Sequence, residues 1–137
     1  MAEEKKKNKM TMNQWIAFIV VLGILLVVLI TVVSDFIFKL NQDWDGYAES
    51  LKTAYQYYKI EDVQYENDIY KIILPSDTYK KMSADQKLEY CKNIYQSTRN
   101  LASKHKILRS HEDIIMRFYS GGERVAEYVA GDLTVYK

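Results

Sequence analysis

The run of nineteen residues from Trp15 to Val33 contains no charged side chain. As an α-helix it would be about 29 Å long, at about 1.5 Å per residue, which is close to the thickness of the hydrocarbon core of a bilayer. A helix at the surface of a soluble protein keeps one polar face, whereas this run is apolar on every face. We therefore predict a single transmembrane helix with an interfacial exit within residues 14–40.

The residues before the run predict where the helix begins. Thr11 and Gln14 have the spacing of a capping box, and Met10 and Trp15 occupy the two hydrophobic-staple positions around it. At the other end, Lys39 is placed to extend its ammonium group towards water from an interfacial exit. We assign the membrane anchor to Trp15, Phe18, Leu22, Leu25, Leu29 and Val33.

Basic residues are unevenly distributed around the predicted span. Residues 1–13 contain four lysines, whereas only Lys39 and Lys52 lie within about twenty residues after the span. Under the positive-inside rule, residues 1–13 form a cytoplasmic tail and residues 43–137 form an extracytoplasmic domain. Hardly any linker separates the span from this domain, so we expect the domain to lie close to the bilayer.

A cleaved signal peptide is the alternative explanation of the apolar run. The preceding tail is basic, and Val32-Val33-Ser34 is an acceptable cleavage site. The run is nevertheless longer than the apolar region of a typical signal peptide, which has about 7–15 residues. We therefore favour an uncleaved signal anchor and a single-pass membrane protein.

The rest of the chain alternates between helical and strand patterns. A helix is predicted over residues 43–60 with Asp45 as its N-cap, and a second begins at Ser83, which forms a capping box with Gln86. Alternating and β-branched runs predict strands at 63–65, 69–74, 114–119, 124–129 and 133–136, and a short turn at 76–78. The order α-β-β-α-β-β-β predicts an α+β domain, in which one or two helices pack on one face of an antiparallel sheet.

Two groups of residues in this domain are candidates for an interaction surface. Tyr47, Tyr55 and Tyr58 fall on one face of the first helix, where they either form a binding platform or, as we favour, pack on the sheet. Lys104, Lys106 and Arg109 form a basic cluster that either contacts anionic headgroups or polymers or, as we favour, complements the end of a helix dipole.

No pattern in the sequence indicates catalysis, a metal site or a cofactor. The only two histidines, His105 and His111, lie among charged residues in a predicted loop, which favours solvated side chains over metal ligands. Cys91, the single cysteine, falls on an apolar helix face, where an inert buried thiol is expected. Residues 39–137 contain fifteen basic and fifteen acidic side chains, and such a neutral domain argues against a nucleic-acid partner.

A basic tail, one span and a small α+β domain rich in Tyr and Lys resemble the layout of envelope proteins of low-GC Gram-positive bacteria. The resemblance rests on layout alone and implies no residue role. We predict a non-catalytic, membrane-anchored extracytoplasmic interaction module that docks another envelope protein or complex. The alternative is a small ligand-binding or enzymatic domain with a dispersed site, which a concave pocket lined by several of Tyr65, Tyr70, Arg117 and Tyr128 would favour.

Overall fold

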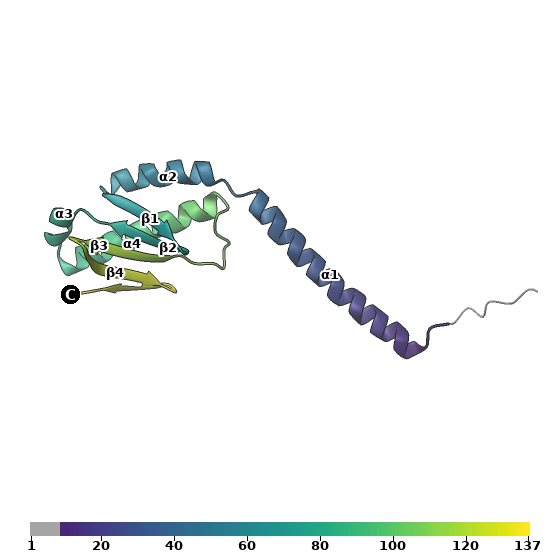
Figure 1. The fold of residues 1–137 in the computed structure, drawn as a ribbon. Coiled ribbons are helices and arrows are strands. Elements are labelled where there is room, and N and C mark those ends of the chain that lie inside the picture. Colours follow the sequence, from purple (N-terminus) through teal and green to yellow (C-terminus); the bar gives the residue numbers. More distant parts are fainter. Residues whose placement is uncertain (1–8) are drawn as a thin grey trace, which may run out of the picture. The chain divides into compact units, whose positions relative to one another are not determined.

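A computed structural model describes residues 9–137. The chain forms two compact units that divide between Asn41 and Gln42 (Figure 1). The first unit consists of helix α1 (Met12–Leu40). The second contains three helices and a five-stranded sheet, so the predicted α+β class is confirmed.

Helix α1 begins as the sequence predicts. Thr11 is the N-cap, the Gln14 amide donates to its hydroxyl at 3.4 Å, and the Thr11 amide donates to the Gln14 side chain at 2.9 Å. No residue of this helix is buried, although nearly all of its side chains are apolar. By length and composition α1 is the one helix in residues 9–137 that could cross a membrane.

The N-cap of helix α2 (Trp44–Tyr57) lies two residues before the predicted one. Its N-cap is Asp43, whose carboxylate accepts a hydrogen bond from the Gly46 amide at 3.0 Å, so the prediction of Asp45 was wrong. Asp45 instead lies in the first turn. Both carboxylates favour a helix N-terminus, and sequence alone does not decide which of two neighbouring aspartates becomes the cap.

Strands β1 (Asp62–Glu66) and β2 (Ile69–Ile73) lie close to the predicted ranges 63–65 and 69–74 and pair as an antiparallel hairpin. Its two turn residues, Asn67 and Asp68, have φ of 52° and 61°. Asn and Asp tolerate this left-handed region better than other non-glycine residues, and two such residues in succession match the twist of a tight hairpin. The hairpin therefore has a turn whose geometry its sequence specifies.

After β2 the chain forms helix α3 (Ser76–Lys80), where only a short turn was predicted. Helix α4 (Ala84–Lys104) follows, and its predicted capping box between Ser83 and Gln86 is present. The chain then enters the last three strands, β3 (Ile115–Ser120), β4 (Glu123–Val129) and β5 (Asp132–Val135).

The sheet order is β1-β2-β3-β4-β5, and every pair is antiparallel except β2 and β3, which are parallel. The prediction of a fully antiparallel sheet was therefore wrong, because the sheet is mixed. The physical reason is the connection: α3 and α4 carry the chain back along the sheet, so β3 enters in the same direction as β2.

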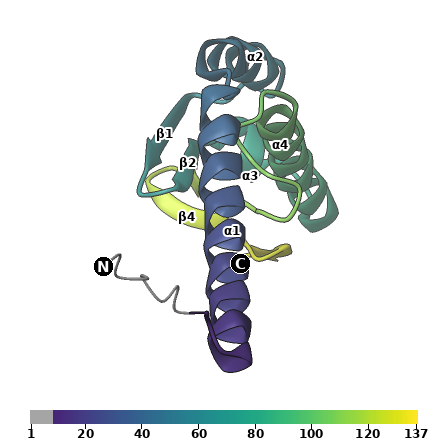
Figure 2. The same cartoon turned by 90° about the vertical axis from the view of Figure 1, so that its right-hand side faces the viewer.

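The core lies on one face of this sheet. The register aligns Tyr70 of β2 with Met116 of β3 and Tyr128 of β4, and the next row aligns Ile72, Phe118 and Ala126. Helices α2 and α4 cover this face: the hydroxyls of Tyr47 and Tyr70 lie 2.5 Å apart, and the ring of Tyr95 stacks on that of Tyr128 (Figures 1 and 2).

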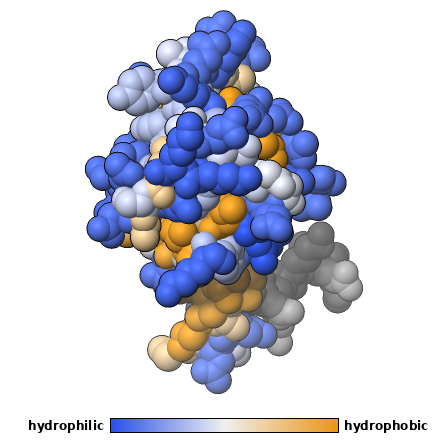
Figure 3. Space-filling view, turned by 90° about the vertical axis from the view of Figure 1, so that its left-hand side faces the viewer, coloured by the Kyte–Doolittle hydropathy of each residue, from blue (hydrophilic) through white to orange (hydrophobic). Residues whose placement is uncertain are grey.

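The outer surface of the domain contrasts with this core. The face drawn in Figure 3 is mainly hydrophilic, with small apolar areas between the polar side chains. The sheet face opposite the helices carries Lys71, Arg117 and Glu127, with Arg117 and Glu127 paired at 3.0 Å. The domain therefore has one apolar layer between helices and sheet, and a polar second face.

Candidate functional site

The six residues predicted as the membrane anchor all lie on α1 and all are exposed: Trp15, Phe18, Leu22, Leu25, Leu29 and Val33. Their spacing of three and four residues places them on one face of the helix, and the other faces are apolar as well. An aqueous environment would leave this apolar surface in contact with water, which is unfavourable by about 25 cal/mol per Å².

The tyrosines predicted as a candidate platform lie on the inner side of α2. Tyr47 is 3% exposed and Tyr55 is 7% exposed. The Tyr55 and Thr98 hydroxyls lie 2.7 Å apart, and the Tyr58 and Ser97 hydroxyls lie 3.0 Å apart. These rings connect α2 to β2 and α4, so the packing alternative describes Tyr47 and Tyr55 and they are not part of the surface.

The basic cluster lies at the end of α4 and in the loop that follows. Lys104 is in the last turn of α4 and is exposed, and Lys106 is exposed with a φ of 62°. The Arg109 guanidinium lies 3.7 Å from the Glu112 carboxylate. The position of Lys104 fits the predicted complement to the helix dipole, and Arg109 is engaged by an acidic neighbour.

His105 was predicted to be a solvated loop residue, and this was wrong. It is the C-cap of α4, and its side chain is only 13% exposed. Its Nδ1 lies 2.9 Å from the Asp43 carboxylate and its Nε2 lies 3.0 Å from the Ser50 hydroxyl. The Gly46 amide and His105 together lower the pKa of Asp43 below 3.8. No local pattern could reveal this contact, because it joins residues 62 positions apart.

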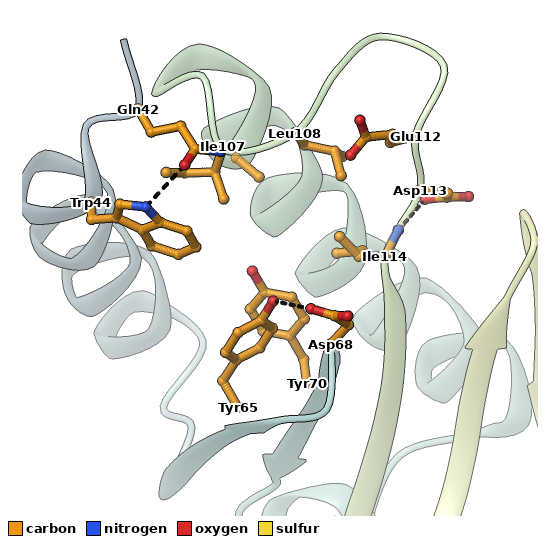
Figure 4. Close-up of a pocket in the computed structure, with 11 residues that line it drawn as sticks. Gln42, Trp44, Tyr65, Asp68, Tyr70, Ile107, Leu108, Glu112, Asp113 and Ile114 are labelled. Atoms are coloured by element: carbon orange, nitrogen blue, oxygen red, sulfur yellow. Dashed lines mark hydrogen bonds between the residues drawn. The ribbon is translucent and has the colours of Figure 1, made fainter. Parts of the chain in front are cut away.

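A cavity in the domain lies next to the residues of this contact along the chain, because Gln42 and Trp44 on either side of Asp43 line it. It has a volume of about 460 Å³, within the range of small-ligand sites. The N-terminal end of α2, the β1–β2 hairpin, the end of α4 and the loop before β3 all contribute to its walls (Figure 4). Its lining consists of Gln42, Trp44, Tyr65, Asp68, Tyr70, Ala102, Ile107, Leu108, Glu112, Asp113 and Ile114.

Two half-exposed aromatic rings border this cavity, which we call the Trp44–Tyr65 pocket. Trp44 is 48% exposed and Tyr65 is 50% exposed. The Trp44 indole donates to the Gln42 side chain at 3.3 Å, and its ring meets that of Tyr47 edge to face. The Tyr65 hydroxyl donates to Asp68 at 3.0 Å, and its ring centroid lies 4.7 Å from that of Tyr70. Both rings are therefore held in place by neighbours.

Ionisation of the pocket phenols is unfavourable. Burial and the hydrogen bond to Asp68 raise the pKa of Tyr65 to about 12. Burial also raises the pKa of Tyr70 and that of Tyr47. Near neutral pH these side chains present neutral rings and hydroxyls, which suits contact with a ligand better than proton abstraction. Burial likewise raises the pKa of Cys91, to about 12.

The four residues proposed for a dispersed site do not share one pocket. Tyr65 and Tyr70 line the Trp44–Tyr65 pocket, whereas Arg117 lines a smaller hollow of about 180 Å³ on the opposite sheet face. Tyr128 stacks on Tyr95 in the core. Within residues 9–137 no group of three or more His, Cys, Asp or Glu side chains is arranged to hold a metal ion.

Comparisons with known proteins add no functional assignment. No protein-family model, no curated protein and no solved structure matches the chain.

Proposed function

We propose that the protein is a membrane-anchored extracytoplasmic interaction module of a bacterial envelope. In this proposal α1 spans the membrane with residues 1–13 in the cytoplasm. The domain over residues 43–137 binds an envelope protein or complex and performs no catalysis. The observation that carries the anchor is that α1 contains the uncharged apolar run from Trp15 to Val33 and that no residue of the helix is buried.

Topology can be tested with the cysteine content of the chain. Cys91 is the only cysteine and is fully buried, so the unchanged chain serves as the unlabelled control. We expect Asn100→Cys on the exposed side of α4 to react with a membrane-impermeant maleimide in spheroplasts. Asn8→Cys in the predicted cytoplasmic tail should react only after lysis. The opposite pattern would contradict the proposed orientation.

Anchoring itself is tested by extraction. The full chain should remain in the membrane fraction in alkaline carbonate, because release would expose the apolar surface of α1 to water. A matured protein that begins near Ser34 and is found free of the membrane would instead support a cleaved signal peptide. N-terminal sequencing of the mature chain distinguishes these outcomes directly.

Protein docking is supported most by the sheet face that carries no helix. It presents Lys71, Arg117 and Tyr119 beside one another, with the Lys71 ammonium 4.7 Å from the Tyr119 ring centroid. Aromatic residues and arginine, here Tyr119 and Arg117, are enriched at protein interfaces. A photo-crosslinker at Tyr119 should capture one specific envelope protein, while a crosslinker at Asn100 on α4 should not. Equal recovery from both positions would count against docking at this face.

The ligand-binding alternative has an observation of its own. The Trp44–Tyr65 pocket is concave, has half-exposed aromatic rings and includes Tyr65 and Tyr70. A monomeric protein gains no stability by leaving such rings in water, and exposed aromatic residues in a hollow are typical of binding sites. Binding of a small ligand is therefore the second candidate function, and the residues that line the pocket indicate the class of ligand.

A further inference from the structure

The lining of the Trp44–Tyr65 pocket has one sign of charge. Asp68, Glu112 and Asp113 are in its walls, and among residues 9–137 no Lys, Arg or His lines it. The faces of Trp and Tyr rings carry partial negative charge, so the half-exposed rings of Trp44 and Tyr65 add to the same sign. Phosphate, carboxylate and other anions would be repelled by this lining.

The three carboxylates are not equally available. Glu112 lies 3.7 Å from the guanidinium of Arg109. Asp113 lies 3.4 Å from that of Arg99, accepts from the Tyr95 hydroxyl, and points away from the cavity in Figure 4.

Asp68 differs from the other two acids. Within residues 9–137 it has no cationic partner, and its one hydrogen bond to another side chain is from Tyr65. The pocket therefore holds one carboxylate without a cation, next to an aromatic ring. This matches a ligand with a single positive charge.

The rest of the lining limits the chemistry of that cation. Ile107, Leu108 and Ile114 supply apolar wall opposite the β1–β2 hairpin (Figure 4). A metal ion would find few oxygen ligands there and would lose its hydration shell against apolar carbon. An organic cation can instead place carbon atoms against these residues and its charge over the aromatic rings.

From this arrangement we infer that the Trp44–Tyr65 pocket binds an organic ammonium ion, with the charged group over Trp44 and Tyr65 and beside Asp68. The carbon part of the ligand lies against Ile107, Leu108 and Ile114. Both rings and Asp68 are already positioned by their neighbours, so little ordering accompanies binding. The ammonium group can belong to a free small molecule or to a zwitterionic lipid headgroup.

This inference names the ligand class of the second candidate function and involves only residues of the domain. It is independent of the topology experiment, because the pocket does not require a particular orientation of α1. A negative result for choline binding would therefore not affect the proposed topology, and a reversed topology would not affect the proposed ligand.

The chain supplies its own reporter of binding. It contains two tryptophans, so the variant Trp15→Phe leaves Trp44 as the only one. In full-length protein in maltoside micelles, choline should change Trp44 emission saturably, with an apparent Kd of about 1 mM for a ligand of this size. The neutral isostere 3,3-dimethylbutanol, which has the same shape without the charge, should bind at least about 5-fold more weakly.

Asp68→Asn tests the contribution of the Asp68 charge most directly. Asparagine tolerates the φ of 61° at this position and can still accept from the Tyr65 hydroxyl, so the turn is kept and only the charge is removed. Choline binding should weaken about 5- to 10-fold, as expected for loss of one partly screened charge contact. Asp77→Asn, at an exposed aspartate outside the pocket, should leave binding unchanged.

Tyr65→Leu supplies a second variant, which removes the ring but keeps an apolar side chain. It should also weaken choline binding relative to the neutral isostere. Equal response to choline and to 3,3-dimethylbutanol, no response to either, or equal affinity in Asp68→Asn and Asp77→Asn would overturn the inference.

The source of the ammonium group is tested with nanodiscs that contain the Trp15→Phe chain. Discs of phosphatidylglycerol lack an ammonium group, and discs that also contain phosphatidylcholine present one at the headgroup. A change in Trp44 emission with phosphatidylcholine, competed by free choline, supports a lipid source. A response to free choline with no difference between the discs supports a soluble ligand. A response to neither overturns the inference.

Discussion

Helices α1 and α4 begin with the same local signal and have opposite environments. Each has a hydroxyl N-cap, Thr11 or Ser83, and a glutamine at the third helical position, Gln14 or Gln86, which completes a capping box. Helix α1 is apolar on every face and buries nothing, whereas α4 is amphipathic and buries five residues. The capping box determines where a helix begins, whereas the pattern of apolar residues determines whether the helix suits a surface with one side in water or an apolar environment on all sides.

The largest expected difference between the two units is their response to alkaline pH. All twelve tyrosines lie in the domain, and burial raises the pKa of Tyr65, Tyr79 and Tyr90 to about 12. The unfolded chain ionises its tyrosines near pH 10, so stability is fully present below that pH and is lost as pH rises towards 12.

We therefore expect the domain to unfold cooperatively between about pH 10 and 12, while α1 in micelles stays helical. Absorbance of tyrosinate at 295 nm and far-ultraviolet circular dichroism would follow the two events. Gradual titration of all tyrosines near pH 10, with no loss of sheet signal, would contradict the buried environments described for the domain.

The second prediction contrasts equal truncations in the two helices. Ile94 of α4 is fully buried, so Ile94→Ala should lower the free energy of unfolding of the domain by about 2–5 kcal/mol. Leu25 of α1 is 59% exposed, so Leu25→Ala should change that free energy by less than about 0.5 kcal/mol. Urea unfolding in micelles measures both, and similar losses would mean that α1 contributes to the core.

A third prediction introduces a charge at matched positions. Leu25→Arg should oppose membrane insertion by about 2.5–3.5 kcal/mol, because an arginine near the centre of a span is costly in hydrocarbon. Leu88→Arg on the exposed side of α4 should leave both membrane association and folding nearly unchanged. Alkaline extraction and urea unfolding separate these effects. Full membrane retention of Leu25→Arg would argue against a transmembrane α1.

The smallest expected effect concerns the two capping boxes. Ser83→Ala should lower domain stability by about 1 kcal/mol, because the Gln86 amide loses its acceptor. Thr11→Ala makes the same change in α1 and should not alter domain unfolding. Hydrogen exchange at the first turn of each helix provides a local measurement, and both turns should exchange faster in their own variant.

Local patterns in the sequence predicted the elements better than their connections. Both capping boxes are confirmed, because neighbouring residues alone determine them. The parallel pairing of β2 with β3 was missed, since strand direction depends on how α3 and α4 return the chain. The choice of Asp43 over Asp45 was also missed, because Asp43 is selected by both Gly46 and the distant His105.

The residues of the candidate site were likewise predicted only in part from the sequence. Tyr65 and Tyr70 were named in advance as residues of a dispersed site, but Trp44 and Asp68 were not. Nothing near Trp44 in the sequence indicates that its ring borders the same cavity as a hairpin more than twenty residues away. For the tyrosines of α2, packing on the sheet was favoured over a surface platform, and Tyr47 and Tyr55 are buried with hydroxyls that find partners on β2 and α4.

The sequence by itself determined that the chain has a long helix apolar on every face, an α+β domain, and the start of each long helix. These properties follow from residues that are neighbours along the chain or repeat with a fixed period. Only the tertiary structure decided the mixed sheet, the contact between Asp43 and His105, and the pocket that brings Trp44 to the hairpin of Tyr65 and Asp68. Those features join residues that are distant in sequence, so they exist only once strand direction and helix packing have brought the residues together.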